Sequence, residues 1–227
     1  GAIDSLGYGQ SLGRFINENG RTLPQESELV EAIKNDPTSH LTSARADLLF
    51  TMNQFSLKAG KYDVSHPYRE TSIIASAWRH KVPFSVHPSI GYDIIANHPI
   101  FSGSAIGRAG EWDFKLFGGS LENLNGGITI SVGSAIMGPQ VFEKAMSCVN
   151  NRRIKLGGTA ITDHSIYVVD IQDGGQWDWQ HGEPPTNNPA YYLRFCKSYS
   201  RMGGTMNYIQ CDNAAFIQRL HHHLIKK

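Results

Sequence analysis

The sequence lacks a charge imbalance of either sign. It contains 21 Lys and Arg residues against 20 Asp and Glu residues, which gives a formal net charge of +1. So small a net charge offers no general attraction to nucleic acid or to an anionic membrane. No apolar run reaches the length of a transmembrane helix, and no signal peptide opens the chain. We therefore expect neither nucleic acid nor a membrane among its partners.

Cysteine is also scarce, and internal repeats and low-complexity tracts are absent. The three cysteines are Cys148, Cys196 and Cys211, an odd number without a C-x-x-C pair. The simplest interpretation is that they are buried thiols in a reducing compartment. We therefore expect a cytoplasmic location.

Apolar residues are present in sufficient number for a sizeable core. The chain has 227 residues, of which 40% are hydrophobic, and this suits one compact unit with a helical addition. Residues 1–81 show helical spacing of apolar side chains and no clear strand, which predicts a mainly helical N-terminal region. Residues 82–227 are predicted to form an α/β domain.

Strand patterns alternate with helical patterns from Val82 onward. The predicted strands are 82–87, 128–132, 159–162, 166–171 and 205–211. Alternation of this kind predicts a parallel sheet with helices on both faces. The apolar run Ile128–Val132, bounded by glycines, is predicted to be a buried central strand of that sheet.

A turn of small residues follows this central strand. Gly133, Ser134 and Ala135 come directly after Val132, and Pro139 suits the first turn of a helix. Such a turn brings backbone N–H groups to a helix N-terminus, where a phosphate is favoured. We take Gly133, Ser134 and Ala135 as candidate cofactor-binding residues, although plain packing also explains a turn of this kind.

Three segments together resemble a known family. They are His87-x-x-x-Gly91-x-Asp93-Ile94-Ile95-x-x-His98-Pro99, then Gly103 to Phe114, and then Gly126-Gly127-x-x-x-x-x-Gly133-Ser134-Ala135. This pattern is similar to the deoxyhypusine-synthase-like group, and more closely to its poorly characterised bacterial members. The resemblance implies a Rossmann-like, doubly wound, mostly parallel sheet, preceded here by the N-terminal helical region. It also implies NAD as cofactor, and homo-oligomers with sites near subunit contacts.

The chain departs from that family at two places. The histidine pair that follows the glycine turn in deoxyhypusine synthases is replaced by Pro139-Gln140, and no tryptophan-containing motif with a catalytic lysine is present. The resemblance therefore implies an NAD-dependent transferase or oxidoreductase of unknown substrate, not a true deoxyhypusine synthase. The alternative is an oligomeric assembly or ligand-binding module that keeps the fold without the chemistry.

Five polar residues are candidate catalytic groups, and no metal site is predicted. His87, Asp93 and His98 lie close together at the end of a predicted strand, where ligands bind in open α/β sheets. Imidazole and carboxylate groups there suit acid–base chemistry, or Asp93 caps a turn and the histidines satisfy backbone groups. Asp163 and His164 end the next strand pattern and are expected to face the same crevice, unless the adjacent side chains point apart.

A long loop over residues 172–189 carries two tryptophans. Trp177 and Trp179, with His181, are expected either to stack on a planar ligand or to fill a subunit contact. Asp113 lies within a helical pattern, and a surface or capping role is expected for it. The predicted partners are a small-molecule substrate or nucleotide and further copies of the chain.

Overall fold

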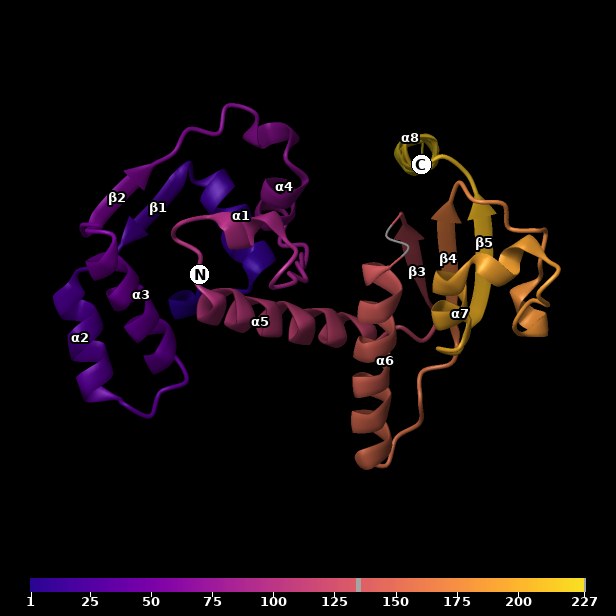
Figure 1. Ribbon diagram of the computed structural model, residues 1–227, viewed down its shortest axis with the longest axis horizontal. Helices are drawn as coiled ribbons and strands as arrows, with labels where there is room; N and C mark the ends of the chain where they lie inside the picture. Colours follow the sequence, from indigo (N-terminus) through magenta and orange to yellow (C-terminus); the bar gives the residue numbers. More distant parts are fainter. Residues whose placement is uncertain (134–135, 227) are drawn as a thin grey trace. The chain divides into compact units, whose positions relative to one another are not determined.

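The structure, a computed structural model, describes residues 1–133 and 136–226. It is a mixed α/β protein that divides into two compact units, Gly1–Phe117 and Gly118–Lys227 (Figure 1). We call these unit 1 and unit 2. The sequence placed the boundary at 81/82, whereas residues 82–117 belong to unit 1.

Unit 1 consists of helices and one small antiparallel sheet. Its longer elements are α1 (Tyr8–Asn17), β1 (Gly20–Leu23), α2 (Glu26–Asn35), α3 (Thr42–Gln54), β2 (Gly60–Asp63), α4 (Ile73–Arg79) and α5 (Gly103–Leu121), and α5 extends past the division between the units. Short 3-10 turns lie at η1 (Ala2–Asp4), η2 (Arg69–Thr71) and η3 (Ile94–Asn97). The helical character predicted for residues 1–81 is confirmed for most of this stretch.

The expectation of no strand before residue 82 is wrong. β1 and β2 pair antiparallel, with Gly20 opposite Asp63 and Leu23 opposite Gly60. Every residue of β2 is exposed, and its sequence Gly-Lys-Tyr-Asp carries no alternation of apolar side chains. The pattern that identifies a half-buried strand is therefore missing, because this strand buries no face.

The strand predicted at residues 82–87 is also wrong. Residues 82–93 contain no helix or strand. The backbone N–H of Val86 donates to the carboxylate of Asp113 at 2.7 Å, so its partner is a side chain of α5. Pro83 and Pro88 have no N–H to donate, and they suit this irregular path better than a sheet interior.

Unit 2 contains a three-stranded parallel sheet with helices between the strands. Its elements are β3 (Gly127–Val132), α6 (Met137–Lys155), β4 (His164–Asp170), η4 (Trp179–His181), η5 (Pro189–Tyr192), α7 (Arg194–Ser200), β5 (Thr205–Gln210) and α8 (Asn213–Ile225). The strand order is β3-β4-β5, and both pairings are parallel. The parallel sheet predicted by the alternating pattern is thus present, while no strand forms at 159–162.

β3 is an edge strand, so the prediction of a buried central strand is wrong. β4 occupies the centre. The side chains of Ile128 and Ile130 are 62% and 43% exposed, whereas Ile166, Val168 and Val169 of β4 are buried. A short run of this kind looks the same in a central strand and in an edge strand, because only the neighbouring strands and helices decide its burial.

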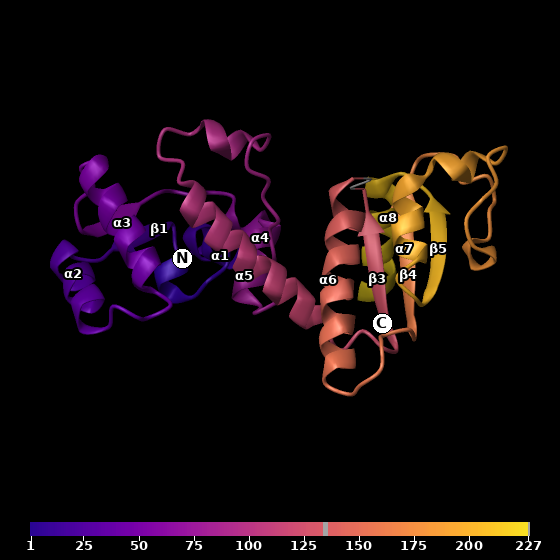
Figure 2. The same cartoon turned by 60° about the horizontal axis from the view of Figure 1, so that its bottom comes forward.

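α6 and α7 cover one face of the sheet. Ser131, Ile166 and Val168 share this face, because the register places Thr129 opposite Ile166 and Ser131 opposite Val168. The hydroxyl of Tyr199, on α7, donates to Ser131 Oγ at 3.0 Å. The ring of Tyr199 also lies 5.2 Å, centre to centre, from that of Phe142 on α6. Figure 2 shows α6, α7 and α8 around the three strands of unit 2. This layer of aromatic and aliphatic side chains is the core of unit 2.

Candidate functional site

The carboxyl edge of the parallel sheet brings three strand ends together. Val132, Asp170 and Gln210 are the last residues of β3, β4 and β5, and Figure 1 shows the three arrowheads at one edge. Gly133 follows with φ of +71°, a conformation that glycine adopts without strain. Its N–H donates to Val169 O at 3.3 Å, which ties the start of the turn to β4. Ser134 and Ala135 lie outside the described residues.

Two helices begin at this edge. α6 starts at Met137, with Pro139 buried in its first turn as predicted, and α8 starts at Asn213. A Cβ atom added to Gly133 would lie 3.2 Å from Asn213 Nδ2, so the turn and the start of α8 are in direct contact. Asn213 Oδ1 is buried and accepts no hydrogen bond from the described part of the chain. Both helices therefore have their N-terminal ends near Gly133, and the Asp212 carboxylate already caps that of α8 by accepting a hydrogen bond from Ala215 N at 2.9 Å.

Asp170 is a site residue that sequence reasoning missed. It ends β4, the strand that neighbours β3, and its Oδ1 accepts a hydrogen bond from Gln172 N at 3.0 Å. Burial, and secondly the Asp170 charge, raise the pKa of the Cys196 thiol and of the Tyr208 hydroxyl. An acidic residue ending the strand that follows a strand–turn–helix unit is the pattern that could have identified it.

Asp163 and His164 lie at the opposite edge from Gly133. His164 is the first residue of β4 and is paired with Gly127, the first residue of β3. The expectation that these two residues end a strand and face the same crevice as the glycine turn is therefore wrong. Hydrophobic periodicity predicted the position of β4 approximately, but not its first residue. The two ends of a parallel strand also have similar composition, so composition did not show which end this was.

His164 is a core residue. Its side chain is 4% exposed, and neither ring nitrogen has a hydrogen-bond partner within residues 1–133 and 136–226. Burial lowers the pKa of His164, and the nearby Asp163 charge only partly offsets this. A neutral, enclosed imidazole suits a packing role.

His87, Asp93 and His98 lie in unit 1, on the irregular segment before α5. His87 Nε2 is 3.2 Å from Ser85 Oγ, and the His87 ring packs edge-on against Phe117. Burial lowers the pKa of His87, with the Asp113 carboxylate acting in the opposite direction. Because no strand precedes these residues, the strand-end argument for a joint site no longer applies.

The side chains of Asp93 and His98 make local backbone contacts. The Asp93 carboxylate accepts a hydrogen bond from Ser89 N, and His98 Nδ1 accepts one from Ile100 N at 3.1 Å. Contacts of this kind stabilise turns. They match the structural alternative more closely than an acid–base role.

Asp113 organises the interior of unit 1. It is completely buried, and its Oδ2 accepts hydrogen bonds from Gly9 N at 2.8 Å and from Val86 N at 2.7 Å. Gly9 lies in the first turn of α1, so Asp113 caps that helix across 104 residues of sequence. The expected capping role is thus confirmed, and the expected surface position is wrong.

Both tryptophans of the 172–189 loop lie against unit 2, although Trp179 Nε1 has no hydrogen-bond partner among the described residues. Trp179 is buried, and Trp177 Nε1 donates to Gly182 O at 3.0 Å. The Trp177 ring also packs against that of His181. Of the three cysteines, Cys196 is buried as expected, whereas Cys148 on α6 is exposed and Cys211 is half-buried.

Within the described residues, no group of three or more His, Cys, Asp and Glu side chains is placed to hold a metal ion. No helix in the same residues is both long and apolar enough to cross a membrane. Comparison of the chain with protein-family models, with curated proteins and with solved structures found no match.

Proposed function

We propose that unit 2 is a Rossmann-like nucleotide-binding module that takes an NAD-like dinucleotide at the carboxyl edge of its sheet. The observation that carries the proposal is the start of two helices, α6 and α8, beside Gly133 at that edge. Ligands of open α/β sheets bind outside the carboxyl ends of the strands.

The phosphate would lie against the first turn of α6. This helix has 19 residues and no acidic residue in its first turn. The sequence carries no charged residue between Glu122 and Glu143, so no carboxylate there repels an anion. Attraction would come from backbone N–H groups and from the helix dipole, which together favour phosphate at a helix N-terminus.

Asp170 distinguishes a nucleotide from a bare phosphate. In strand–turn–helix–strand units that bind dinucleotides, the acidic residue ending the second strand accepts hydrogen bonds from the ribose hydroxyls. Asp170 has this place relative to Gly133, because it ends β4 and β4 is paired directly with β3. The proposal concerns binding, since the five candidate catalytic residues are divided between unit 1 and the far edge of the sheet.

Calorimetric titration with NAD, NADP and FAD tests this proposal. Asp170→Ala should weaken binding of the accepted dinucleotide about tenfold, which is what the loss of one charged hydrogen-bond acceptor usually costs. Asp173→Ala is the matched control, because Asp173 is an exposed carboxylate on the loop that follows β4. Ser134→Asp places a carboxylate next to the expected phosphate and should weaken binding at least about fivefold.

The proposal fails if the native chain binds none of the three dinucleotides. Equal binding by the native chain and by Ser134→Asp would place the ligand away from the glycine turn. A loss of binding in the Asp173→Ala control as large as in Asp170→Ala would remove the assignment of the ribose to Asp170.

One observation favours assembly as a second candidate function. β3 is an edge strand whose exposed Ile128 and Ile130 carry no charge that would repel another strand. Edge strands without lysine, proline or a bulge are templates for pairing with another chain. We propose that two copies of the chain pair through β3, which would make the protein a homo-oligomer.

Sedimentation at micromolar concentration tests this second candidate. Ile130→Lys should convert a dimer into monomers, while Leu156→Lys, at an exposed position after α6, should leave the mass unchanged. A native chain that sediments as a monomer would remove the assembly role and leave nucleotide binding unaffected.

A further inference from the structure

Unit 1 contains a cavity of about 420 Å³ between α1, α4 and the segment that follows α4. The residues that line it include the aromatic Trp78 and Phe84 and the aliphatic Ile74 and Val82. Pockets that hold small ligands commonly measure about 300–1,000 Å³ and are mostly apolar, with a few polar groups that fix orientation. The cavity has the size and the walls of such a pocket.

The charged residues that line this cavity have one sign. They are Arg79 and Lys81, and no carboxylate lines the cavity. Arg79 is partly neutralised, because its Nη2 lies 3.5 Å from a Glu70 carboxylate oxygen. Lys81 is exposed, and its side chain makes no ion pair or hydrogen bond with the described part of the chain. An anionic group at the opening would therefore meet an uncompensated ammonium group.

The backbone of Lys81 has a conformation that is unfavourable for residues other than glycine. It has φ of +55° at the end of α4, and its N–H donates to Trp78 O while Val82 N–H donates to Ala77 O. These two bonds form a Schellman motif, in which the left-handed residue is usually glycine. A lysine there is strained, and strained positions are concentrated at functional sites.

The same hydrogen-bond pattern also occurs in unit 1 at Ser5, after η1, and at Ser56, after α3. Ser56 follows α3 with φ of +51°, and the N–H groups of Ser56 and Leu57 donate to Asn53 O and Met52 O. Ser56 does not line the cavity. The motif at Ser56 provides a matched reference for the backbone strain at Lys81.

We propose that this cavity binds a planar aromatic anion, with the ring between Trp78 and Phe84 and the anionic group paired with Lys81. Aromatic walls favour a flat apolar ring through offset or edge-on stacking. The charge of Lys81 and Arg79 then selects a carboxylate over a neutral or cationic group of the same shape. The site is formed by unit 1 alone and does not depend on the nucleotide site of unit 2.

Calorimetry with three ligands of one shape tests the charge selection. Naphthoate, naphthylmethanol and naphthylmethylammonium share a ring system and differ in charge. Naphthoate should bind at least about tenfold more tightly than the alcohol, and the ammonium compound should bind weakest. Equal affinities for all three, or no binding of naphthoate, would overturn the proposal.

Substitutions at Lys81 and Ser56 separate ligand binding from folding. Lys81→Gly and Ser56→Gly should both raise the unfolding temperature, because glycine adopts a positive φ without strain. Of these two substitutions, only Lys81→Gly should weaken the binding of naphthoate, by about tenfold. Lys81→Arg keeps the positive charge and should retain binding. Unchanged naphthoate affinity in Lys81→Gly would remove Lys81 from the site.

Substitution of an aromatic residue that lines the cavity, and titration with a dinucleotide in the presence of naphthoate, locate the site within the molecule. Phe84→Leu removes an aromatic wall and should weaken naphthoate and naphthylmethanol to a similar extent, because both stack the same ring. Saturating naphthoate should leave the dinucleotide titration unchanged, so failure of either site is seen separately. Undiminished naphthoate binding in Phe84→Leu would place the ligand elsewhere.

Discussion

Unit 1 and unit 2 both bury apolar side chains, but they differ in the buried groups that join their elements. In unit 2, an apolar layer formed by Phe142, Ile166 and Val168 lies between a parallel sheet and two helices. In unit 1, a buried carboxylate, Asp113, joins α5 to α1 and to the irregular segment around Val86. Apolar burial is non-directional, whereas a buried carboxylate requires particular donors at particular places.

The difference extends to the proposed sites. The nucleotide site proposed for unit 2 would use backbone groups at the ends of strands and helices, a position set by topology. The cavity of unit 1 uses side chains that surround a space between α1, α4 and the next segment. The following four substitutions test whether the two units are as independent, and as differently stabilised, as this comparison implies.

The largest effect is expected from removing an aromatic ring from the core of unit 2. Phe142 is buried against Tyr199, and Phe142→Ala should destabilise unit 2 by about 4 kcal/mol through lost burial and a residual cavity. Hydrogen exchange should quicken in β3, β4 and β5 and remain unchanged in α1 and α4. An equal increase in both units would show that they unfold as one cooperative body.

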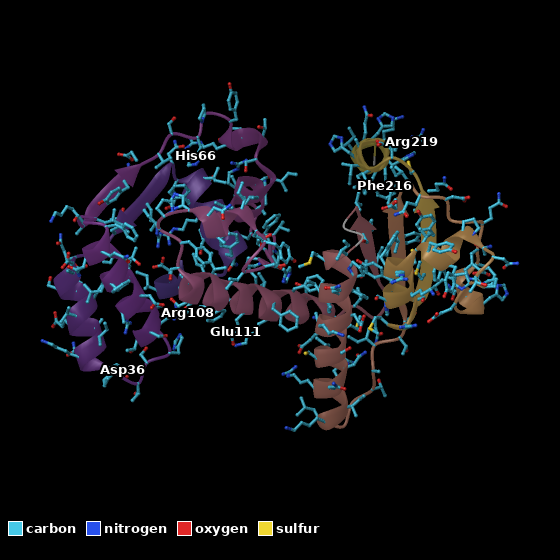
Figure 3. The ribbon with its side chains drawn as sticks, in the orientation of Figure 1. Asp36, His66, Arg108, Glu111, Phe216 and Arg219 are labelled. Atoms are coloured by element: carbon cyan, nitrogen blue, oxygen red, sulfur yellow. The ribbon has the colours of Figure 1, made fainter. Side chains whose placement is uncertain are left out.

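A slightly smaller effect is expected from removing the buried carboxylate of unit 1. Asp113→Ala leaves the N–H groups of Gly9 and Val86 buried without an acceptor, which should cost about 3 kcal/mol. Glu111→Ala, on the exposed side of the same helix (Figure 3), is the control and should leave the unfolding midpoint almost unchanged. Chemical denaturation monitored by hydrogen exchange would report the two units separately, and intact protection of α1 in Asp113→Ala would contradict the capping role.

Removing one hydroxyl from unit 2 should have a modest effect. Tyr199→Phe deletes the hydrogen bond to Ser131 Oγ and keeps the ring, so a loss of about 1 kcal/mol is expected. Tyr192→Phe, at an exposed position of the same unit, should change the midpoint very little. Equal losses in the two variants would mean that the Tyr199–Ser131 bond contributes no net stability.

The smallest effect concerns pH, because each unit contains one histidine whose pKa is lowered by burial. The pKa values of His87 in unit 1 and of His164 in unit 2 both lie below the usual 6.5. As the pH falls, each histidine is therefore protonated in the unfolded chain before it is protonated in the folded chain. The stability that the neutral form provides is therefore complete above about pH 6.5 and is lost as the pH falls through the folded-state pKa. His164→Leu should remove this loss from unit 2 and leave it in unit 1, which serves as the internal control. An unchanged pH dependence of unit 2 in unfolding experiments would show that His164 does not titrate with folding.

Local pattern identified most helices and the parallel strands. The stretches around α3, α5 and α6 show apolar spacing or suitable end residues, and the alternation from β3 to β5 indicates parallel pairing. β1 and β2 gave no such pattern, since β2 is exposed throughout and Gly20 is the only buried residue of β1. The segment 82–87 has the composition of a strand, but its Val86 N–H is satisfied by a side chain remote in sequence.

The residues of the candidate site were also only partly predictable from the sequence. Gly133 was identified from the turn that it forms, because φ of +71° and a following helix leave a local pattern. Asp170 and Asn213 were missed, because they approach Gly133 only once β4 and α8 are in place. The five predicted catalytic residues share favourable chemistry but not one location, and spatial proximity is not encoded in residue type.

The sequence by itself determined the near-neutral charge, the helical start, the parallel strands and the turn at Gly133. Each of these depends on composition or on neighbours within a few residues, where propensity and periodicity act. The tertiary structure decided which strand is central, which edge His164 occupies, that Asp113 is buried, and that Lys81 lines a cavity. These properties depend on contacts between residues far apart in the chain, and such contacts are fixed only when the whole of each unit packs.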